Sequence, residues 1–570
     1  MDSIPDIIIG IDFGMTCTGV AYQKPRMDAP HVIKIWPGKG GSASKVPTEL
    51  DYKGGKLQKW GFLCPDDIEP GVVHREWFKR YLDPAKLAKE QQENPNTAPE
   101  SMTEVKKWLE GSSWNDSKIE FLFSLPTTWT SPSLIEEFRT IIRGAGYGSG
   151  GIKHTVEIGL TEAEAAAVYT AKNQTASYKE GDVMLVCDAG GGTTDVSILK
   201  TNAIHSASPG LKQLVPVQGA SIGSTDIDSS FEKVVIERLD FMYPSQTAKN
   251  RGLAFSAIKS ESFLTHKYGF GDPAYEDLRE LSFKLPGIPP EVTHTPVGIQ
   301  NGKLILTRLE FAQLYSAQVE RIYALIDKQL AQLHSSHPGE QVKYLILSGG
   351  LGSSPYIQRK IKERYGSSSV KVLLSDEPQE AVVKGLVIDR FQTFKQKPII
   401  TSRCCRASYG VLCSQRYEKN NPNHIGGQFI VDPVDGKKYV INMIRWFIHK
   451  GDSISTEAPI RYPFYRTIKP GDPNRRWNTK VVTSSNLKSY LPKSIEDESN
   501  LIGVTQDQFK QVKKGLFKCK PGYFVAEYNI NVAIGAADIR FQLHFQGKNY
   551  TADRPVIVEW VPAPVKDEED

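Results

Sequence analysis

Acidic residues, glycines and threonines gather at two places along this 570-residue chain, each directly after a short apolar run. The first is the segment 12–16, Asp-Phe-Gly-Met-Thr, which follows Ile-Ile-Ile-Gly-Ile. The second is the segment 188–195, Asp-Ala-Gly-Gly-Gly-Thr-Thr-Asp, which follows Val-Met-Leu-Val-Cys. Glycines let backbone amides approach a phosphate closely, and carboxylates hold a hydrated divalent cation. The two segments therefore predict a site for a nucleotide polyphosphate, ATP or ADP, with Mg²⁺.

Each residue type in these segments has its own predicted task. The carboxylates of Asp12, Asp188 and Asp195 stand at strand ends, where they would bind Mg²⁺. The remaining residues offer backbone amides or hydroxyl groups to the phosphates, and they are Gly14, Thr16, Gly190, Gly191, Gly192 and Thr193. Phosphoryl transfer at such a site depends mainly on positioning and on charge stabilisation.

Short buried strands must position both segments. The β-branched runs and their spacing predict one hairpin from strands 7–12 and 18–22 and another from strands 183–187 and 196–199. Two similar hairpins this far apart indicate duplicated lobes. Each hairpin would then present its turn to one central cleft.

A third apolar strand, 342–347, ends in Ser-Gly-Gly, with Gly349 and Gly350, before a helix at 355–365. This glycine pair is compatible with a nucleotide contact and equally with a plain strand-to-helix connection. The nucleotide contact is favoured only because the glycine pair follows the other two motifs in this order and at this spacing.

Helical patterns fill most of the space between these strands. Segments 131–145 and 161–172 are predicted helices, the second with Thr161 as its N-cap. From 224 to about 336 the pattern is mostly helical, with a Pro- and Gly-rich interruption at 285–298. The sequence thus predicts an α/β fold for the first part of the chain.

The character of the sequence changes after about residue 397. Alternating apolar runs at 439–448, 523–532, 539–545 and 556–561 are separated by turn residues, which is typical of a β-sandwich. We therefore predict a nucleotide-binding domain at 1–397, a β-rich domain at 398–562 and an acidic tail at 563–570. Since so few residues follow the last run, we expect no helical subdomain after it.

Composition argues against several other classes of protein. The formal net charge is only +5, from 70 basic and 65 acidic side chains, and basic clusters such as 360–364 contain acids at helical spacing, so no nucleic-acid partner is expected. No apolar run approaches the roughly 20 residues that cross a bilayer, and the acidic N-terminus is unlike a signal peptide, so no membrane partner is expected. Seven scattered cysteines without metal-ligand spacing fit free thiols in the cytosol.

Together the motifs at 10–16, 188–195 and 347–350 resemble the two phosphate motifs and the adenosine motif of the actin-like ATPase superfamily. The Ala-rich segment 162–168 looks like the connecting helix of the heat-shock protein seventy family, and 380–385 is similar to that family's closing helix. The chain is most similar in pattern to the divergent, lidless branch with the twelve-A and twelve-B proteins. The resemblance implies a two-lobed domain with a duplicated ribonuclease-H-like fold, followed by a domain similar to the chaperones' substrate-binding β-domain.

The resemblance also implies roles for residues that the motifs alone do not assign. Glu162 would orient the attacking water or a metal-bound water, and Lys79 falls near the place of the family's γ-phosphate lysine. Lys259 would match a lysine that touches the ribose. A surface helix lysine is an equal alternative for Lys79, and a solvent-facing role for Lys259.

Several positions depart from the family pattern. Met15 offers the phosphates a backbone amide but no hydroxyl, while Leu351 and Ser353 replace residues that frame adenine. Ser256 stands where a ribose-binding glutamate is expected, and Glu164 replaces a threonine, where it would be either an extra metal ligand or a surface acid.

These observations leave three functional hypotheses. The first is a slow ATPase whose nucleotide state regulates a client-binding β-rich domain, with protein clients or co-chaperones as partners. The second is a nucleotide-binding scaffold without significant hydrolysis. The third is a small-metabolite kinase, although no separate catalytic base is apparent.

Overall fold

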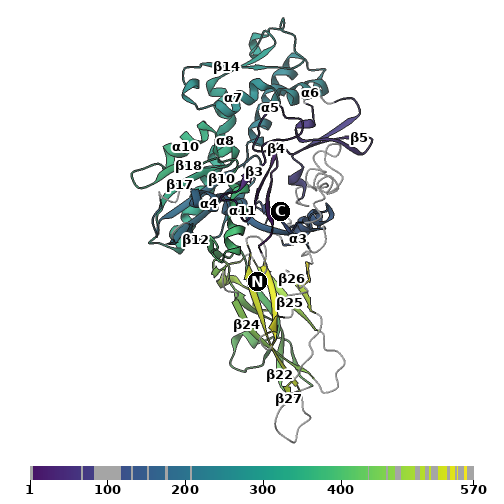
Figure 1. Cartoon of the computed structure of the whole chain (residues 1–570), viewed down its shortest axis with the longest axis vertical. Helices are drawn as coiled ribbons and strands as arrows, with labels where there is room; N and C mark the ends of the chain where they lie inside the picture. Colours follow the sequence, from purple (N-terminus) through teal and green to yellow (C-terminus); the bar gives the residue numbers. More distant parts are fainter. Residues whose placement is uncertain are drawn as a thin grey trace. The chain divides into compact units, whose positions relative to one another are not determined.

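The computed structural model divides into two compact units, one made of Met1–Thr130 with Leu134–Ile400 and one made of Ser131–Ser133 with Thr401–Asp570. The structure describes residues 4–65, 69–82, 117–129, 132–149, 153–173, 178–205, 208–433, 435–456, 460–468, 477–484, 486–494, 501–506, 513–514, 524–535, 539–545, 548–549 and 557–560. The predicted acidic tail at 563–570 lies outside the described residues. The first unit appears in purple to green in Figure 1, and the second in green to yellow.

The first lobe of the first unit is built on a mixed sheet. Its main strands, in spatial order, are β3 (His31–Val32), β2 (Cys17–Gln23), β1 (Ile7–Phe13), β8 (Ile119–Leu125) and β9 (His154–Thr161). β1 and β2 form the predicted antiparallel hairpin, whereas β1, β8 and β9 run parallel to one another. β8 is buried along its whole length, as expected for a strand covered on both faces.

The second lobe repeats this arrangement. Its corresponding strands are β12 (Ser208–Gln213), β11 (Thr194–His205), β10 (Val183–Ala189), β17 (Val342–Ser348) and β18 (Lys371–Leu374). Here β10 and β11 form the antiparallel hairpin, and β10, β17 and β18 are parallel. The same order and directions in both sheets confirm the predicted actin-like fold with duplicated lobes.

Two helices connect the lobes. Helix α4 (Glu162–Asn173) leads from β9 of the first sheet to β10 of the second, and α11 (Ala381–Phe394) follows β18 and packs on β1 and β8. The two helices touch without an intervening side chain, because a Cβ atom on Gly385 would lie 1.9 Å from the carbonyl oxygen of Ala165. Glycine is therefore required at this crossing.

The predicted N-cap of α4 is confirmed as part of a capping box. The Thr161 hydroxyl accepts a hydrogen bond from the Glu164 amide at 3.3 Å, and the Glu164 carboxylate accepts one from the Thr161 amide at 3.1 Å. This reciprocal pair of hydrogen bonds fixes the start of the helix at Glu162.

The region predicted as mostly helical contains more strand than expected. Helices α5 (Thr225–Met242), α6 (Thr247–Ile258), α7 (Glu261–Gly269) and α8 (Arg308–Ser336) are present. Between α7 and α8, however, β14 (Glu280–Lys284), β15 (Ile299–Gln300) and β16 (Lys303–Thr307) form a small antiparallel sheet (Figure 1). Buried and more exposed residues alternate along β14 and β16, but each strand has only five residues, too few to stand out beside the helical pattern.

A second small sheet belongs to the first lobe. It consists of β6 (Lys56–Trp60), β5 (Glu49–Lys53) and β7 (Val72–Glu76), in this order. β5 is central and antiparallel to both neighbours. A 3₁₀ turn, η2 (Phe78–Leu82), follows β7 and carries Lys79.

The second unit is the predicted β-sandwich. One sheet has the order β21 (Phe429–Val431), β22 (Lys438–Ile448), β20 (Ser408–Arg416), β25 (Trp477–Ser484), β26 (Leu501–Gln506) and β31 (Ile557–Trp560). The other has the order β24 (Ile460–Ile468), β28 (Phe524–Ile534), β29 (Ile539–Phe545) and β30 (Lys548–Asn549), with β27 (Lys513–Lys514) beside β28. Val411 and Phe447 of the first sheet share one core with Ile530 and Val532 of the second.

Candidate functional site

A cavity of about 500 Å³ lies where the turns of the two hairpins meet. This volume is within the usual range for a small-molecule site. Thirteen of the fifteen residues predicted for the site line it, and they are Asp12, Gly14, Met15, Thr16, Lys79, Glu162, Asp188, Gly190, Gly191, Gly192, Thr193, Gly349 and Gly350. Asp195 and Lys259 are not among the lining residues. The fold therefore brings together segments that are far apart in the sequence.

Strand register explains how the carboxylates converge. Asp12 lies near the end of β1, and Asp188 lies at the equivalent place in β10. Asp195 is the direct register partner of Asp188 across the β10–β11 hairpin. Asp12 and Asp188 line the cavity, and Asp195 lies behind them, with only 1% of its surface exposed.

In the first hairpin, the Asp12 carboxylate already has cationic partners. Lys45 Nζ lies 2.6 Å from Asp12 Oδ2, and the Ser124 hydroxyl donates to Asp12 Oδ1 at 3.0 Å. Burial alone favours the neutral acid, but the charges of Lys45 and Lys79 outweigh it and lower the pKa of Asp12. Asp12 also raises the pKa of Lys45 despite the burial of that amine. The pair is therefore a salt bridge at the cavity between a buried carboxylate and a half-buried lysine, whose side chains are 6% and 21% exposed.

In the second hairpin, the carboxylates repel one another. Burial, followed by the charges of Glu162 and Asp12, raises the pKa of Asp188 to about 7. Burial and the charges of Glu162 and Asp188 also raise the pKa of Asp195 well above its usual range. Within the described part of the chain, Asp188 Oδ1 is buried without a hydrogen-bond partner. A buried carboxylate oxygen of this kind is suited to binding a cation.

Glu162 and Lys79 form an ion pair at the cavity wall. Lys79 Nζ lies 2.9 Å from Glu162 Oε1, and the Thr193 hydroxyl lies 3.4 Å from Glu162 Oε2. Lys79 is only 6% exposed, and its ammonium lies 5.8 Å from the ring centres of Phe13 and Trp129. The alternative of a surface lysine is therefore wrong for Lys79.

Three other residues considered from the sequence lie away from the cavity lining. Lys259 pairs with Glu76 at 3.1 Å, so the alternative of a purely solvent-facing lysine is wrong. Glu164 is buried and accepts a hydrogen bond from Gln213 at 2.7 Å, so it is neither a surface acid nor a lining residue. The Ser256 hydroxyl donates to the Gly252 carbonyl within its own helix.

Met15 bridges the two turns. A Cβ atom on Gly192 would lie 2.1 Å from the Met15 methyl carbon, so the thioether rests directly on the glycine-rich turn. Leu351 lines the cavity and is 3% exposed, whereas the Ser353 hydroxyl donates to the Gly349 carbonyl at 2.7 Å. Of the departures from the family pattern, Met15 and Leu351 thus place apolar side chains at the cavity.

Sequence reasoning missed several lining residues. Lys45 is part of no motif, and only its position opposite Asp12 shows its importance. Lys267 forms a buried pair with Asp228 at 2.6 Å, and the adjacent Tyr268 contributes an aromatic ring that is 64% exposed. A helical segment with Lys-Tyr carries no pattern that distinguishes a cavity wall from an ordinary surface.

Comparison with known proteins gives matches along both units. Family models described as Domain of unknown function (DUF8340) and Domain of unknown function (DUF8568) match residues 177–376 and 403–561. Heat shock 70 kDa protein 12A of Mus musculus is 22% identical over 82% of this chain and 80% of its own length. Heat shock 70 kDa protein 12B of Homo sapiens is 21% identical over 82% and 79%. Chaperone protein DnaK of Thermoplasma volcanium is 28% identical over 37% and 31%.

The chain is thus similar to proteins of the heat-shock protein seventy family. This similarity agrees with the duplicated sheets, the cavity between their hairpins and the β-sandwich.

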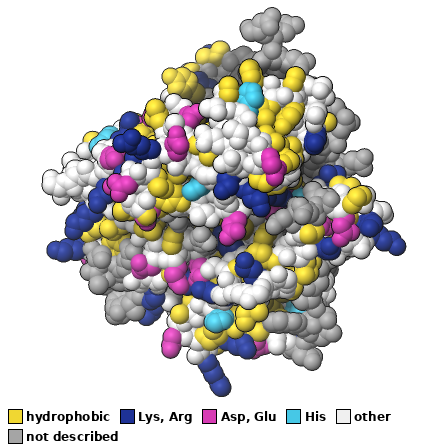
Figure 2. Space-filling model, turned by 90° about the horizontal axis from the view of Figure 1, so that it is seen from above, with side chains coloured by type: hydrophobic (Ala, Val, Ile, Leu, Met, Phe, Trp, Pro, Cys, Tyr) yellow, Lys and Arg dark blue, Asp and Glu magenta, His cyan; other side chains and the backbone are white. Residues whose placement is uncertain are grey.

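Two further findings concern the helices and the surface charge. None of the helices in the described ranges has the length and apolar content needed to cross a membrane. On the face in Figure 2, basic and acidic side chains are interspersed among the coloured residues rather than separated into fields of one sign.

Proposed function

We propose that this protein binds ATP with Mg²⁺ in the cavity between the hairpins, hydrolyses it slowly, and uses its nucleotide state to regulate a client-binding β-sandwich in the cytosol. One observation carries the proposal: both glycine-containing turns and the carboxylates Asp12 and Asp188 line a single cavity of about 500 Å³. Backbone amides of the turns would hold the phosphates.

The donor set fits a hydrated magnesium ion. Mg²⁺ requires oxygen ligands and retains several waters, so it needs few carboxylates from the protein. Asp12, Asp188 and Asp195 would hold the ion and its waters, and the unpartnered Asp188 Oδ1 is the first candidate. When bound, Mg²⁺ would offset the negative charge of the phosphates. Burial and the neighbouring carboxylates raise the pKa of Asp188 to about 7, and the same positive charge would offset both effects.

Glu162 and Lys79 provide the groups needed for hydrolysis. Their ion pair at 2.9 Å keeps both side chains at the cavity wall. A terminal phosphate would attract the Lys79 ammonium and so leave the Glu162 carboxylate available to accept hydrogen bonds from the attacking water. The capping box that begins directly before Glu162 fixes the backbone from which this carboxylate projects.

The base would lie against the apolar part of the cavity. Leu351, Gly350 and Tyr268 all line the cavity, and the exposed ring of Tyr268 offers a stacking surface. A wall of this kind recognises a flat ring more than its hydrogen-bonding edge. We therefore propose that selectivity for adenine over guanine is modest.

The β-sandwich offers a surface for an extended apolar segment of a client protein. Strand β21 ends the order of the described strands in its sheet, and Phe429, Ile430 and Val431 are 52%, 46% and 61% exposed. An edge strand of this kind can add a further strand through its backbone groups while apolar side chains provide affinity. Ile430→Lys should weaken binding of an apolar peptide, whereas Leu309→Lys, at a 71% exposed leucine of the other unit, should not.

The decisive experiment measures phosphate release by the purified full-length chain with ATP, with and without Mg²⁺. We expect slow, Mg²⁺-dependent turnover that Asp188→Asn abolishes. The matched control is Asp327→Asn, which removes a carboxylate that pairs with Arg364 at the surface, 2.7 Å away. Turnover equal in the wild type and Asp188→Asn would refute the enzymatic part of the proposal.

A nucleotide-binding scaffold without hydrolysis is the second candidate. It is favoured by Met15, which rests on the phosphate turn at Gly192, and by Lys45, which already neutralises Asp12. Calorimetry separates the candidates, because tight Mg²⁺–ATP binding without measurable turnover would support the scaffold. Absence of nucleotide binding would contradict both.

A further inference from the structure

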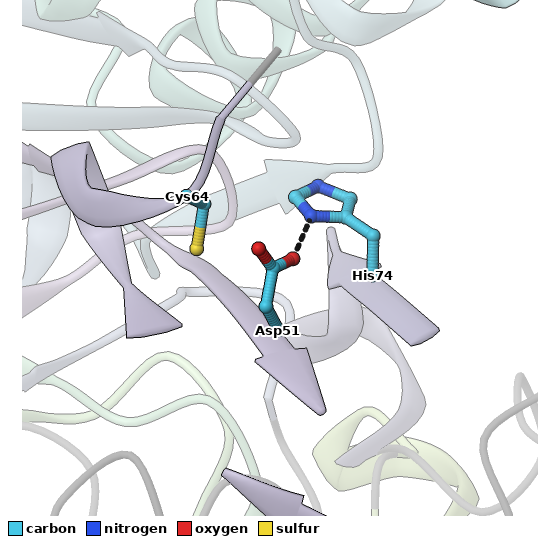
Figure 3. A group of neighbouring side chains, drawn as sticks. All are labelled: Asp51, Cys64 and His74. Carbon is cyan, nitrogen blue, oxygen red and sulfur yellow. Dashed lines mark hydrogen bonds and ion pairs between the residues drawn. The ribbon is translucent and has the colours of Figure 1, made fainter. Parts of the chain in front are cut away.

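Outside the nucleotide cavity, an aspartate, a cysteine and a histidine point toward one another at the small sheet of the first lobe (Figure 3). Asp51 of β5 and His74 of β7 are register partners, and Cys64 follows the 3₁₀ turn η1 (Gly61–Leu63). One ligand atom from each of the three residues lies within 4.8 Å of the other two. The Asp51 and His74 side chains are each only 4% exposed.

We propose that Asp51, Cys64 and His74 form a zinc-binding site, with His74 as a ligand through Nδ1. A thiolate, an imidazole and a carboxylate together are characteristic ligands of Zn²⁺, whereas Mg²⁺ and Ca²⁺ require oxygen ligands. Three protein ligands leave a fourth tetrahedral position. Because Cys64 is half-buried rather than enclosed, water can reach this position.

The opposite side of the imidazole has carboxylates that could accept its second N–H when a metal is bound. His74 Nε2 faces Glu49 Oε2 at 3.9 Å and Glu76 Oε2 at 3.8 Å. A histidine that binds a metal through one nitrogen normally donates the N–H of the other to a carboxylate. In the present structure Lys259 Nζ lies 3.3 Å from His74 Nε2, which accepts its hydrogen bond, and 3.1 Å from Glu76 Oε2. Zinc binding at Nδ1 would move the imidazole proton to Nε2, and Lys259 would keep Glu76 as its partner.

Zinc binding requires only small movements and a defined loss of protons. His74 Nδ1 and Asp51 Oδ1 are now 2.7 Å apart and share a hydrogen bond. Bond lengths of about 2.0 to 2.3 Å place tetrahedral ligand atoms about 3.3 to 3.7 Å apart, so the three groups would adjust by about 1 Å. The Cys64 S–H and His74 Nδ1–H bonds are replaced by Zn–S and Zn–N bonds. The thiol proton passes to solvent, and the imidazole carries its proton on Nε2.

Two other interpretations of this cluster make different predictions. A reactive cysteine is disfavoured, because burial and the negative charge of Asp51 raise the pKa of Cys64 to about 12 and keep the free thiol protonated. The second interpretation is a metal-free network in which the Cys64 thiol and the His74 imidazole both hydrogen-bond to Asp51. Such a network predicts no tight zinc binding, so the titration below separates it from the zinc site.

The site would affect the strand that leads to the nucleotide cavity. β7 ends at Glu76, and Lys79 follows in η2. A metal ion joining β5, β7 and the turn before Cys64 would hold this strand in place. The zinc site does not depend on the proposed ATPase activity.

The experiment uses full-length protein stripped with a chelator and then titrated with Zn²⁺ alone. We expect one equivalent of tightly bound zinc, with affinity reduced at least about tenfold in Cys64→Ser and in His74→Gln. Cys413→Ser, at another half-buried cysteine, and Asp188→Asn, in the nucleotide cavity, should retain wild-type affinity. The Asp188→Asn result separates this proposal from that of the nucleotide site.

A second measurement requires no variant and therefore no assumption about folding of mutants. Alkylation of each cysteine in the wild-type protein is followed by mass spectrometry of its peptides. Zn²⁺ should slow alkylation of Cys64 at least about tenfold, and a chelator should restore the original rate. The alkylation rate of Cys413 should be the same with and without Zn²⁺. Equal alkylation of Cys64 with and without Zn²⁺, or zinc binding unaffected by Cys64→Ser, would overturn the proposal.

Discussion

The two hairpins at the cavity have the same topology but opposite electrostatic surroundings. Asp12 in the first hairpin pairs with Lys45 at 2.6 Å, and its pKa is lowered. In the second hairpin, burial and the charges of Glu162 and Asp12 raise the pKa of Asp188 to about 7. Duplication has therefore preserved the backbone while the charges around it have diverged.

This difference indicates a division of tasks. A satisfied carboxylate stabilises the empty protein, whereas a crowded one is stabilised only when a cation arrives. We infer that the first hairpin contributes mainly to folding and the second mainly to recognition of the metal–nucleotide complex. Variants in the two hairpins should therefore have contrasting effects.

The largest contrast is expected between Asp188→Asn and Asp12→Asn. Asp188→Asn should reduce Mg²⁺-dependent phosphate release at least about 100-fold, because a carboxylate facing the metal is lost. Without ligand, Asp188→Asn should not lower the free energy of unfolding, and above pH 7 the variant should be more stable than the wild type. Because the pKa of Asp188 is about 7 in the folded protein and about 4 in the unfolded chain, ionisation of Asp188 destabilises the wild type as pH rises through this range.

Asp12→Asn should instead destabilise the empty protein by about 3 kcal/mol, because Lys45 is left buried without its counter-charge. Thermal unfolding of both variants at pH 5 and pH 8 measures the contrast. Equal destabilisation by the two substitutions would show that the hairpins are electrostatically equivalent.

A carboxylate outside both turns provides a reference for the satisfied state. Although burial favours its neutral form, ion pairs with Lys34 and Lys384 and a hydrogen bond from Ser44 lower the pKa of Glu380 to about 2. A lowered folded pKa contributes stability above the unfolded value of about 4.3, which is lost as pH falls toward 2. At neutral pH the wild type should therefore be more stable than Glu380→Gln by on the order of 2 kcal/mol. This difference in the free energy of unfolding should disappear as pH falls toward 2. Identical acid unfolding curves would contradict this assignment.

Lys45→Met tests whether the first hairpin can be made to resemble the second. Removal of the ammonium should free Asp12 for the metal and lower the Mg²⁺ concentration for half-maximal nucleotide binding about tenfold. Lys34→Met, which removes a lysine that pairs with Glu380, is the control. An unchanged Mg²⁺ requirement in Lys45→Met would mean that Asp12 takes no part in metal binding.

Met15→Thr should have the smallest effect. It removes the thioether from Gly192 and adds a hydroxyl donor for the phosphates, so ATP affinity should rise a few-fold, about 1 kcal/mol. Met15→Leu keeps an apolar side chain of similar volume and should show no gain. Calorimetric titration of both variants would decide, and equal affinities would exclude a contribution from the added hydroxyl.

Local patterns were sufficient for much of the fold. The hairpins, the start of α4 after Thr161 and the β-sandwich follow from periodicity, turn residues and capping signals within a few residues of each position. The convergence of the glycine-rich turns could also be predicted, because the motifs occur in a characteristic order.

Features that depend on distant contacts could not be predicted in this way. Lys45 belongs to the site only because it pairs with Asp12 of β1, and no local sequence pattern predicts this contact. Cys64 stands ten residues before His74 in a spacing unlike that of common metal motifs, and β-strand register alone places His74 beside Asp51. The short strands β14 and β16 gain their stability from pairing with each other rather than from their own sequences.

The direct contact between α4 and α11 has a mechanical consequence for the cavity. At Gly385 the backbone of α11 meets the Ala165 carbonyl directly, so we expect the helices to rotate about this point. Since one helix joins the two lobes and the other leaves the second lobe to pack on the first, we expect the lobes to move by rotation about this point rather than by sliding. The substitution Gly385→Ala would push the two helices apart, and the width of the cavity entrance would change although no lining residue had been altered.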